Sequence, residues 1–187
     1  MSDTGRTHLF LAGFMGTGKS TVGRAVAKRL RRTFVDLDVI VEQMRHRLIT
    51  DIFRDQGEPA FRKFEARALR MVVTSPGMVI AVGGGAPTTS SVRRIMRHCG
   101  RTVLLTADWN ALWRRVQSTL NTRPLLPAQE LANAADFAVC AEPILRSRAA
   151  AYHEVADWTL DTSLLGVTDV VDRISAWYTD QINTTQV

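Results

Sequence analysis

The chain has 187 residues, of which 45% are hydrophobic, with two cysteines and a formal net charge of +6. This length suits one domain with a sizeable core, and two cysteines are too few for a disulfide framework or a zinc cluster. The basic side chains are scattered without interleaved aromatic residues, and no apolar run is long enough for a membrane span or a signal segment. We therefore expect a single-domain, cytoplasmic, monomeric protein with neither a nucleic-acid nor a membrane partner.

The first predicted unit is a strand at residues 9–12, a glycine-rich loop at residues 13–21 and a helix at residues 19–30. The loop matches the phosphate-binding pattern G-x-x-x-x-G-K-[ST], in which backbone N–H groups and a lysine hold a polyphosphate and a hydroxyl binds Mg²⁺. The predicted nucleotide-binding residues of this loop are Gly13, Gly16, Thr17, Gly18, Lys19, Ser20 and Thr21. The alternative is a flexible glycine turn between a strand and a helix.

Short apolar runs alternate with amphipathic segments along the rest of the chain. Further strands are predicted at residues 34–36, 78–82, 102–106 and 158–160. Further helices are predicted at residues 39–44, 50–56, 58–74, 90–99, 108–120, 143–155 and 167–181, with Pro143 in a first turn. This alternation predicts a three-layer α/β sandwich with a five-stranded parallel sheet, whose loops after the strands converge on one cleft.

Two carboxylates one residue apart, Asp36 and Asp38, follow the second predicted strand. Alternation along an extended backbone would aim both to one side. A phosphoryl-transfer site needs one carboxylate near Mg²⁺ and another near the attacking hydroxyl, so this spacing is a candidate for both roles. The alternative is that Asp38 only caps the helix predicted from residue 39.

Glycines follow the third predicted strand as an uninterrupted triplet, Gly83, Gly84 and Gly85. Consecutive glycines are costly in backbone entropy, and they allow a ligand to approach the main chain closely. The alternative is a flexible connection between a strand and a helix.

Three arginines are candidates for binding an anion. Arg62 lies off the apolar stripe of its predicted helix, and Arg148 has the same character; for both, the alternative is a solvated helix face. Arg123 lies in the irregular stretch at residues 121–133, where an arginine on a mobile segment could close over transferring phosphates.

These features occur in one order: Gly-x-Met-Gly-Thr-Gly-Lys-Ser-Thr, Asp-Leu-Asp, Phe-Arg-x-x-Glu, Gly-Gly-Gly-Ala, Arg-Pro-Leu-Leu, and Arg148 four residues before Tyr152. The ordered set spans residues 8–160 and resembles the shikimate kinase family. The resemblance implies a P-loop fold like that of nucleoside-monophosphate kinases. It also implies transfer of the γ-phosphoryl group of ATP to the 3-hydroxyl of shikimate, giving shikimate 3-phosphate in the chorismate route to aromatic amino acids.

The same resemblance implies a role for each feature. Lys19 and Arg123 would neutralise phosphate charge, and Asp38 would accept the proton of the substrate hydroxyl. Mg²⁺ would be held by Ser20 and Asp36, and Arg115 would stack near the adenine. The implied substrate-binding residues are Asp38, Arg62, Gly83, Gly84, Gly85 and Arg148, with a mobile lid around residues 120–135.

Two departures from the family pattern concern the lid and the alignment of Arg148. The stretch at residues 123–148 is longer than expected, with an apolar insert at residues 134–141, and Ala149 to Ala151 stand before Tyr152 where the family has a proline.

Two rival functions are another small-metabolite kinase, acting on gluconate or another cyclitol acid, and a non-catalytic nucleotide-binding protein.

Overall fold

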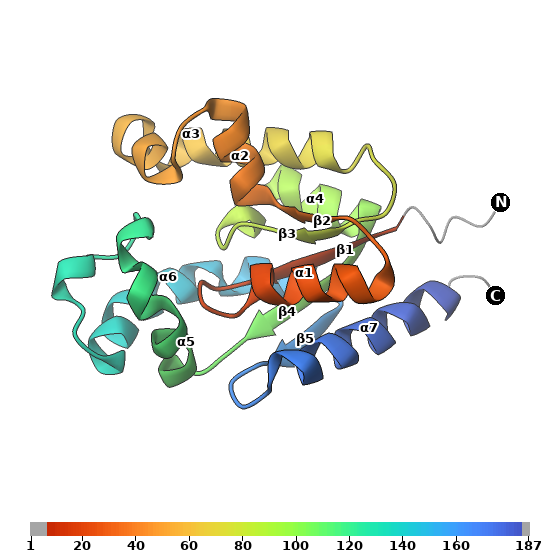
Figure 1. Cartoon of the computed structure of the whole chain (residues 1–187). Helices are drawn as coiled ribbons and strands as arrows, with labels where there is room; N and C mark the ends of the chain where they lie inside the picture. Colours follow the sequence, from red (N-terminus) through yellow and green to blue (C-terminus); the bar gives the residue numbers. More distant parts are fainter. Residues whose placement is uncertain (1–6, 185–187) are drawn as a thin grey trace.

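The computed structural model describes residues 7–184, in which five parallel strands form one sheet with helices on both faces (Figure 1). The strands are β1 (His8–Gly13), β2 (Phe34–Asp36), β3 (Val79–Ala81), β4 (Gly100–Thr106) and β5 (Trp158–Asp161). Their order is β2-β3-β1-β4-β5, and every neighbouring pair is parallel. The predicted α/β fold and its five-stranded parallel sheet are therefore confirmed.

Helices cover both faces of this sheet, with α1 and α7 on one face and α2, α3 and α4 on the other (Figure 1). The α-helices are α1 (Lys19–Leu30), α2 (Leu37–Arg45), α3 (Ile49–Val72), α4 (Ser90–Cys99), α5 (Trp109–Val116), α6 (Ala134–Val155) and α7 (Val167–Thr184). Short 3₁₀ turns are η2 (Ala86–Thr88), η3 (Gln117–Thr122) and η4 (Ala128–Glu130). Within residues 7–184, none of the helices has the length and apolarity needed to cross a bilayer.

Strand β1 lies at the centre of the sheet and is buried along its whole length. Leu9 and Leu11 pack with α1 and α7, while Phe10 and Ala12 pack with α2, α3 and α4. This alternation explains why β1 is an unbroken apolar run, as expected for a strand covered on both faces. The loop after β1 starts between β3 and β4, at the reversal of strand order where open α/β sheets bind ligands.

Helix α3 joins the two helices predicted at residues 50–56 and 58–74. Gly57, with φ 76° and ψ 171°, makes a kink inside it, so the predicted break persists as a bend. That φ lies in the left-handed region, which glycine tolerates at little cost. The kink separates the start of α3 from the segment that carries Arg62.

Helix α6 begins at Ala134, so the predicted start at Pro143 was wrong. The side chain of Asn133 caps it by accepting hydrogen bonds from the N–H groups of Ala135 and Asp136, at 2.8 and 3.0 Å. Such a cap satisfies backbone N–H groups that have no partner at the start of a helix. Pro143 lies nine residues further on, in the helix interior. The apolar insert at residues 134–141 is thus the first part of α6.

A third apolar cluster lies at one end of the sheet, between α5 and the start of α6. Phe137 makes edge-to-face contact with Trp109, with ring centroids 5.9 Å apart. The buried members of the cluster are Phe14, Leu112, Val116, Leu120, Leu126, Leu131, Phe137 and Ala141. Leu120, Leu126 and Leu131 anchor residues 117–133, the segment between α5 and α6, to this cluster.

Histidine 8 makes two hydrogen bonds that specify its neutral form. Its Nδ1 accepts from the N–H of Met78 at 3.1 Å, so Nε2 carries the proton and donates to the carbonyl of Val73 at 3.3 Å. Burial lowers its pKa below 6.5, and the charge of Arg32 adds to this effect. The folded state therefore resists protonation that the unfolded chain accepts.

We expect the free energy of unfolding to fall as the pH drops below about 6.5, because only the unfolded chain then binds a proton at His8. His8→Phe keeps a ring at this position and should remove this part of the pH dependence. Denaturant titrations at pH 5 and pH 7.5 would measure it. Parallel pH profiles for the two proteins would contradict this assignment.

Candidate active site

A pocket of about 490 Å³ lies beside the loop after β1 and collects nearly all the predicted site residues. Its walls come from the segments that follow β1, β2, β3 and β5, together with parts of α3, α6 and residues 122–125. The predicted residues that line it are Gly16, Thr17, Gly18, Lys19, Ser20, Thr21, Asp36, Asp38, Arg62, Gly83, Gly84, Gly85, Arg115, Arg123 and Arg148. Gly13 does not line it but accepts a hydrogen bond from Lys19.

Three glycines allow the phosphate-binding loop to take its shape. Gly13, Gly16 and Gly18 have φ angles of 141°, 78° and 99°. A Cβ at Gly13 would lie 2.3 Å from the carbonyl oxygen of Leu105, and one at Gly16 would lie 2.7 Å from Cγ1 of Val116. At Gly13 and Gly16 any other residue would be strained in its backbone and would clash with these atoms. The two glycines are therefore required by the shape of the loop and do not merely make a flexible turn. Gly18 also caps the start of α1, whose first N–H groups suit an anion.

Lys19 is a half-buried cation whose ammonium is bound to this loop. Its Nζ donates to the carbonyl oxygens of Gly13 and Phe14, at 2.8 and 3.0 Å. Burial lowers the pKa of Lys19 to about 8, and the charge of Asp38 acts in the opposite direction. Carbonyl groups compensate a cation less well than a carboxylate does, so this ammonium suits phosphate oxygens.

Asp36 links the phosphate-binding loop to the start of α2. Its Oδ2 accepts from the hydroxyl of Ser20 at 2.6 Å, and its Oδ1 accepts from the N–H of Asp38 at 3.2 Å. Helix α2 begins at Leu37, so Asp36 is its N-cap, and the alternative that Asp38 caps this helix is wrong. The carboxylate of Asp38 is therefore free for another role.

Ser20 and Asp36 suit a magnesium ion. Within residues 7–184, no group of three or more His, Cys, Asp or Glu side chains is arranged to hold a metal. Mg²⁺ at nucleotide sites takes only one or two protein oxygens and completes its shell with water and phosphate. The hard oxygen donors of these two side chains, which lie next to each other, match that requirement.

The Oδ1 atom of Asp38 is buried and has no hydrogen-bond partner within the described part of the chain. Burial raises its pKa and the charge of Asp36 adds to this, while the charge of Lys19 opposes both. A Cβ at Gly83 would lie 2.7 Å from this oxygen and 2.1 Å from Oε1 of Glu65. Gly83 is therefore needed because two carboxylates approach its backbone closely.

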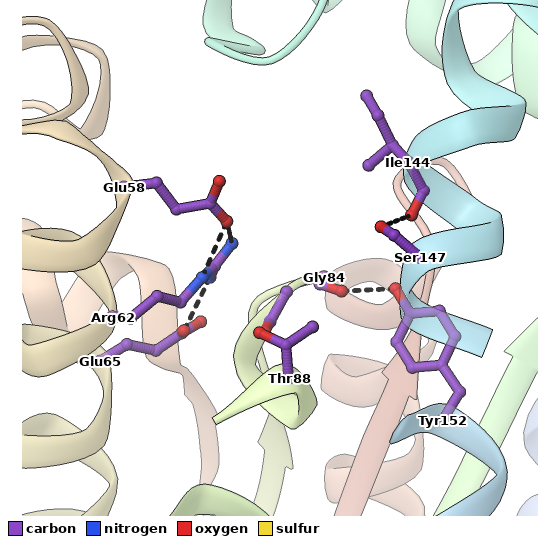
Figure 2. Close-up of polar contacts among 9 residues, drawn as sticks. Glu58, Arg62, Glu65, Gly84, Thr88, Ile144, Ser147 and Tyr152 are labelled. Atoms are coloured by element: carbon purple, nitrogen blue, oxygen red, sulfur yellow. Dashed lines mark hydrogen bonds and ion pairs between the residues drawn. The ribbon is translucent and has the colours of Figure 1, made fainter. Parts of the chain in front are cut away.

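Arg62 lies between two carboxylates on its own helix, α3 (Figure 2). Its NH2 lies 2.6 Å from Oε1 of Glu58, and its NH1 lies 2.8 Å from Oε2 of Glu65. Burial raises the pKa of Glu65 to about 7 despite the ion pair with Arg62. The glutamates lie four residues before and three after Arg62, so helical spacing alone could have indicated this cluster.

Arg148 differs from Arg62 because it is buried without a carboxylate partner in the described part of the chain. It is 6% exposed, and within residues 7–184 it forms no ion pair with a carboxylate. Its guanidinium carbon lies 6.0 Å from the ring centroid of Phe14. Because uncompensated buried charge is costly, such an arginine facing a pocket indicates an anion site.

Two further arginines, Arg115 and Arg123, line the pocket. Burial lowers the pKa of Arg123, whose Nε has no acceptor within residues 7–184. Arg115 donates to the carbonyl of Thr162 at 2.7 Å and to that of Gly16 at 3.3 Å, so it ties the phosphate-binding loop to the segment after β5. Sequence reasoning missed Thr162, because a single threonine after a strand carries no motif.

Sequence reasoning also missed the apolar wall of the pocket. Ile49, Phe53 and Phe61 of α3 line it. Apolar residues at helical spacing predict core packing, and these three pack against the core as well as lining the pocket. Only the three-dimensional arrangement distinguishes the two environments.

Comparisons with known proteins place this chain in one family. A family model described as shikimate kinase matches residues 15–179. The shikimate kinase of Bacteroides thetaiotaomicron is 36% identical over 70% of this chain and 75% of its own length. That of Bordetella avium is 34% identical over 89% of this chain and 76% of its own.

Solved structures support the same grouping. Shikimate kinase from Acinetobacter baumannii in complex with shikimate has a TM-score of 0.84 and 30% identity, covering 94% of both chains. A gluconokinase from Sinorhizobium meliloti has a TM-score of 0.58 at 14% identity, covering 97% of this chain and 96% of its own, which is likeness of fold alone. From the family model and the curated relatives, we conclude that this chain belongs to the shikimate kinase family.

Proposed function

We propose that the chain transfers the γ-phosphoryl group of ATP to the 3-hydroxyl of shikimate, giving shikimate 3-phosphate in the chorismate route. The observation that carries the proposal is one pocket that joins a phosphate-binding loop to Asp38, whose buried Oδ1 has no hydrogen-bond partner within residues 7–184, and to the buried guanidinium of Arg148, which forms no ion pair there. The first arrangement suits a nucleotide, and the other two suit a small acid with a hydroxyl group. The shikimate-bound relative from Acinetobacter baumannii supports the same acceptor.

The nucleotide end of the pocket would hold the triphosphate of ATP. Backbone N–H groups of Gly13 to Thr21 would bind its oxygens, and Lys19 would neutralise charge on the β- and γ-phosphates. Ser20 and Asp36 would hold Mg²⁺, which supplies charge neutralisation at the same oxygens. Arg115 would lie near the adenine, and Arg123 would reach the phosphates from residues 120–135, the proposed lid. The last two residues of that range belong to the first turn of α6.

Asp38 would act at the reacting oxygen. A carboxylate with an unsatisfied oxygen can accept a hydrogen bond from the attacking hydroxyl and then its proton. The positive charges of Lys19, Arg62 and Arg123 lower the pKa of Asp38 against the effect of burial, and so favour its carboxylate form. The chemistry therefore depends on placing a hydroxyl between Asp38 and the γ-phosphate.

Arginines would select a carboxylate at the acceptor end. Within residues 7–184 Arg148 forms no ion pair, and its side chain hydrogen-bonds with that of Tyr152, whereas all three guanidinium nitrogens of Arg62 already donate to Glu58 and Glu65. A guanidinium can bind a planar carboxylate with two parallel hydrogen bonds. The backbone of Gly83 to Gly85 would contact the ring hydroxyls.

Arg148→Lys should raise the KM for shikimate on the order of 100-fold, because a lysine keeps the charge but loses the two-pronged contact. The KM for ATP should change little. Steady-state kinetics with each substrate varied in turn would measure the split. Equal changes in both KM values would count against a carboxylate site at Arg148.

The proposal treats the enzyme as a cytoplasmic monomer. Cys99 and Cys140 are both free thiols in the structure, which is consistent with a reducing compartment. Size-exclusion chromatography with light scattering would test the monomeric state.

A substrate panel tests the function against its rivals. Purified protein with MgATP would be supplied in turn with shikimate, quinate, gluconate and nucleoside monophosphates while ADP release is followed. Turnover that requires shikimate supports the proposal. Preference for gluconate or quinate would indicate another small-metabolite kinase, and ATP binding without any turnover would indicate a non-catalytic nucleotide-binding protein.

A further inference from the structure

The carbonyl groups of the glycine triplet are all held by hydrogen bonds. The carbonyl of Gly83 accepts from the N–H of Ala86 at 3.0 Å, and that of Gly85 accepts from the N–H and the hydroxyl of Thr88, at 3.0 and 2.7 Å. The carbonyl of Gly84 accepts from the hydroxyl of Tyr152. By contrast, the N–H groups of Gly84 and Gly85 donate no hydrogen bond within residues 7–184, and both residues line the pocket.

The contact with Tyr152 differs from the others because it comes from another element. Tyr152 lies on α6, 68 positions along the chain from Gly84, whereas Ala86 and Thr88 are local partners. Its side chain is 3% exposed and packs in the core cluster under α3 and α4. Burial raises the pKa of its phenol, which therefore stays protonated and donates at neutral pH.

Peptide geometry gives this hydrogen bond a consequence inside the pocket. The carbonyl of Gly84 and the N–H of Gly85 belong to one planar trans unit and point in opposite directions. Holding the carbonyl towards α6 turns this N–H away from α6, towards the side of Arg62. Figure 2 shows Gly84 between Arg62 of α3 and Tyr152 of α6, and a Cβ at Gly85 would lie 2.0 Å from NH2 of Arg62.

Nothing in the triplet itself keeps this orientation. Glycine on both sides of the peptide unit lets it rotate with little steric cost, since neither residue has a Cβ to restrict it. The hydroxyl of Tyr152 is then the group that selects one of the two orientations. Tyr152 also lies one helical turn after Arg148, whose side chain hydrogen-bonds with that of Tyr152 and whose NH1 would lie 3.4 Å from a Cβ at Gly84.

We propose that Tyr152 is a positioning residue for the acceptor substrate, because its hydroxyl holds the Gly84–Gly85 peptide with the Gly85 N–H available to a substrate oxygen. Tyr152 itself does not contact the reacting atoms. This inference rests on the proposed function, since it assigns the N–H to the shikimate end of the pocket.

Tyr152→Phe removes this hydroxyl and keeps the buried ring. The KM for shikimate should rise about tenfold, as expected for loss of one well-oriented hydrogen bond to substrate, while the KM for ATP stays the same. Tyr178→Phe is the matched control, because its hydroxyl also donates from a buried tyrosine to a backbone carbonyl, that of Thr7, at 2.6 Å. Tyr178 lies on α7 and does not line the pocket, so its variant should leave both KM values unchanged.

A second measurement reports the peptide directly. The Gly85 amide resonance in ¹⁵N-labelled protein should be broadened or split in Tyr152→Phe and unchanged in Tyr178→Phe. An unaltered shikimate KM in Tyr152→Phe, an equal rise in both KM values, or an unaltered Gly85 resonance would overturn the inference while the proposed function stands. Failure of the parent protein to phosphorylate shikimate would instead overturn the proposed function and this inference with it.

Discussion

Asp38→Asn should lower kcat by about 10²- to 10⁴-fold, the range expected when a positioned general base is lost. An amide has nearly the same shape as a carboxylate, but it cannot accept the proton of the attacking hydroxyl. The KM for ATP should change little, because Asp38 lies at the acceptor end. Steady-state kinetics at saturating MgATP and shikimate would measure the loss.

Stability separates this role from a structural one. Burial raises the pKa of Asp38, so the folded state bears a cost for its charge, which a neutral amide avoids. The thermal midpoint of Asp38→Asn should therefore stay close to that of the parent protein. Asp172→Asn is the control and should keep full activity, because Asp172 is an exposed residue of α7 whose ion-pair partner is Arg29 of α1. A fully active Asp38→Asn enzyme would be incompatible with the proposed base.

Lys19→Met should lower kcat by about 10²- to 10³-fold, because the loop then lacks the cation that stabilises charge on the transferring phosphoryl group. Methionine fills a similar apolar volume without the ammonium. The KM for shikimate should change less than kcat does. The same coupled assay would measure both constants.

The thermal midpoint of Lys19→Met should stay close to that of the parent protein or rise slightly above it. The pKa of Lys19 is lowered to about 8 by burial, so the folded protein holds this charge at a cost. Loss of two hydrogen bonds to loop carbonyls offsets part of the gain from removing it. Lys28→Met on the exposed face of the same helix is the control and should alter neither activity nor the thermal midpoint. A Lys19→Met protein with parental kcat would remove the phosphate role assigned to it.

Elements with local signals were predicted closely. Helix α1 runs from Lys19 to Leu30 as predicted, because the phosphate-binding motif marks its start and an amphipathic stripe marks its length. Helix α4 also matches its predicted range, Ser90 to Cys99. The paired aspartates and the glycine triplet were placed in one cleft because the carboxyl ends of parallel strands meet at one edge of the sheet.

The missed start of α6 has a local explanation. Proline lacks an N–H and crowds the carbonyl four residues earlier, which favours a first-turn position. That carbonyl belongs to Val139, which is 73% exposed, so water can reach the backbone around it. Meanwhile Phe137 and Ala141 are fully buried against α5 and its neighbours, and this packing outweighs the cost of an interior proline.

Contacts between distant segments could not be predicted from the sequence. The hydroxyl of Tyr152 meets Gly84 only because η2 and α6 pack together, and Arg115 meets Thr162 only because the segment after β5 lies beside the phosphate-binding loop. Neither pair has a spacing or composition that marks it. These contacts depend on tertiary packing, which local patterns do not describe.

The geometry of the reacting groups is tested most directly by a crystal structure with shikimate, Mg²⁺ and a non-hydrolysable ATP analogue bound together. The 3-hydroxyl of shikimate should lie within about 3.2 Å of the Asp38 carboxylate and in line with the γ-phosphate held over Lys19. A bound shikimate whose 3-hydroxyl lies away from Asp38, or whose carboxylate avoids Arg148, would contradict the account.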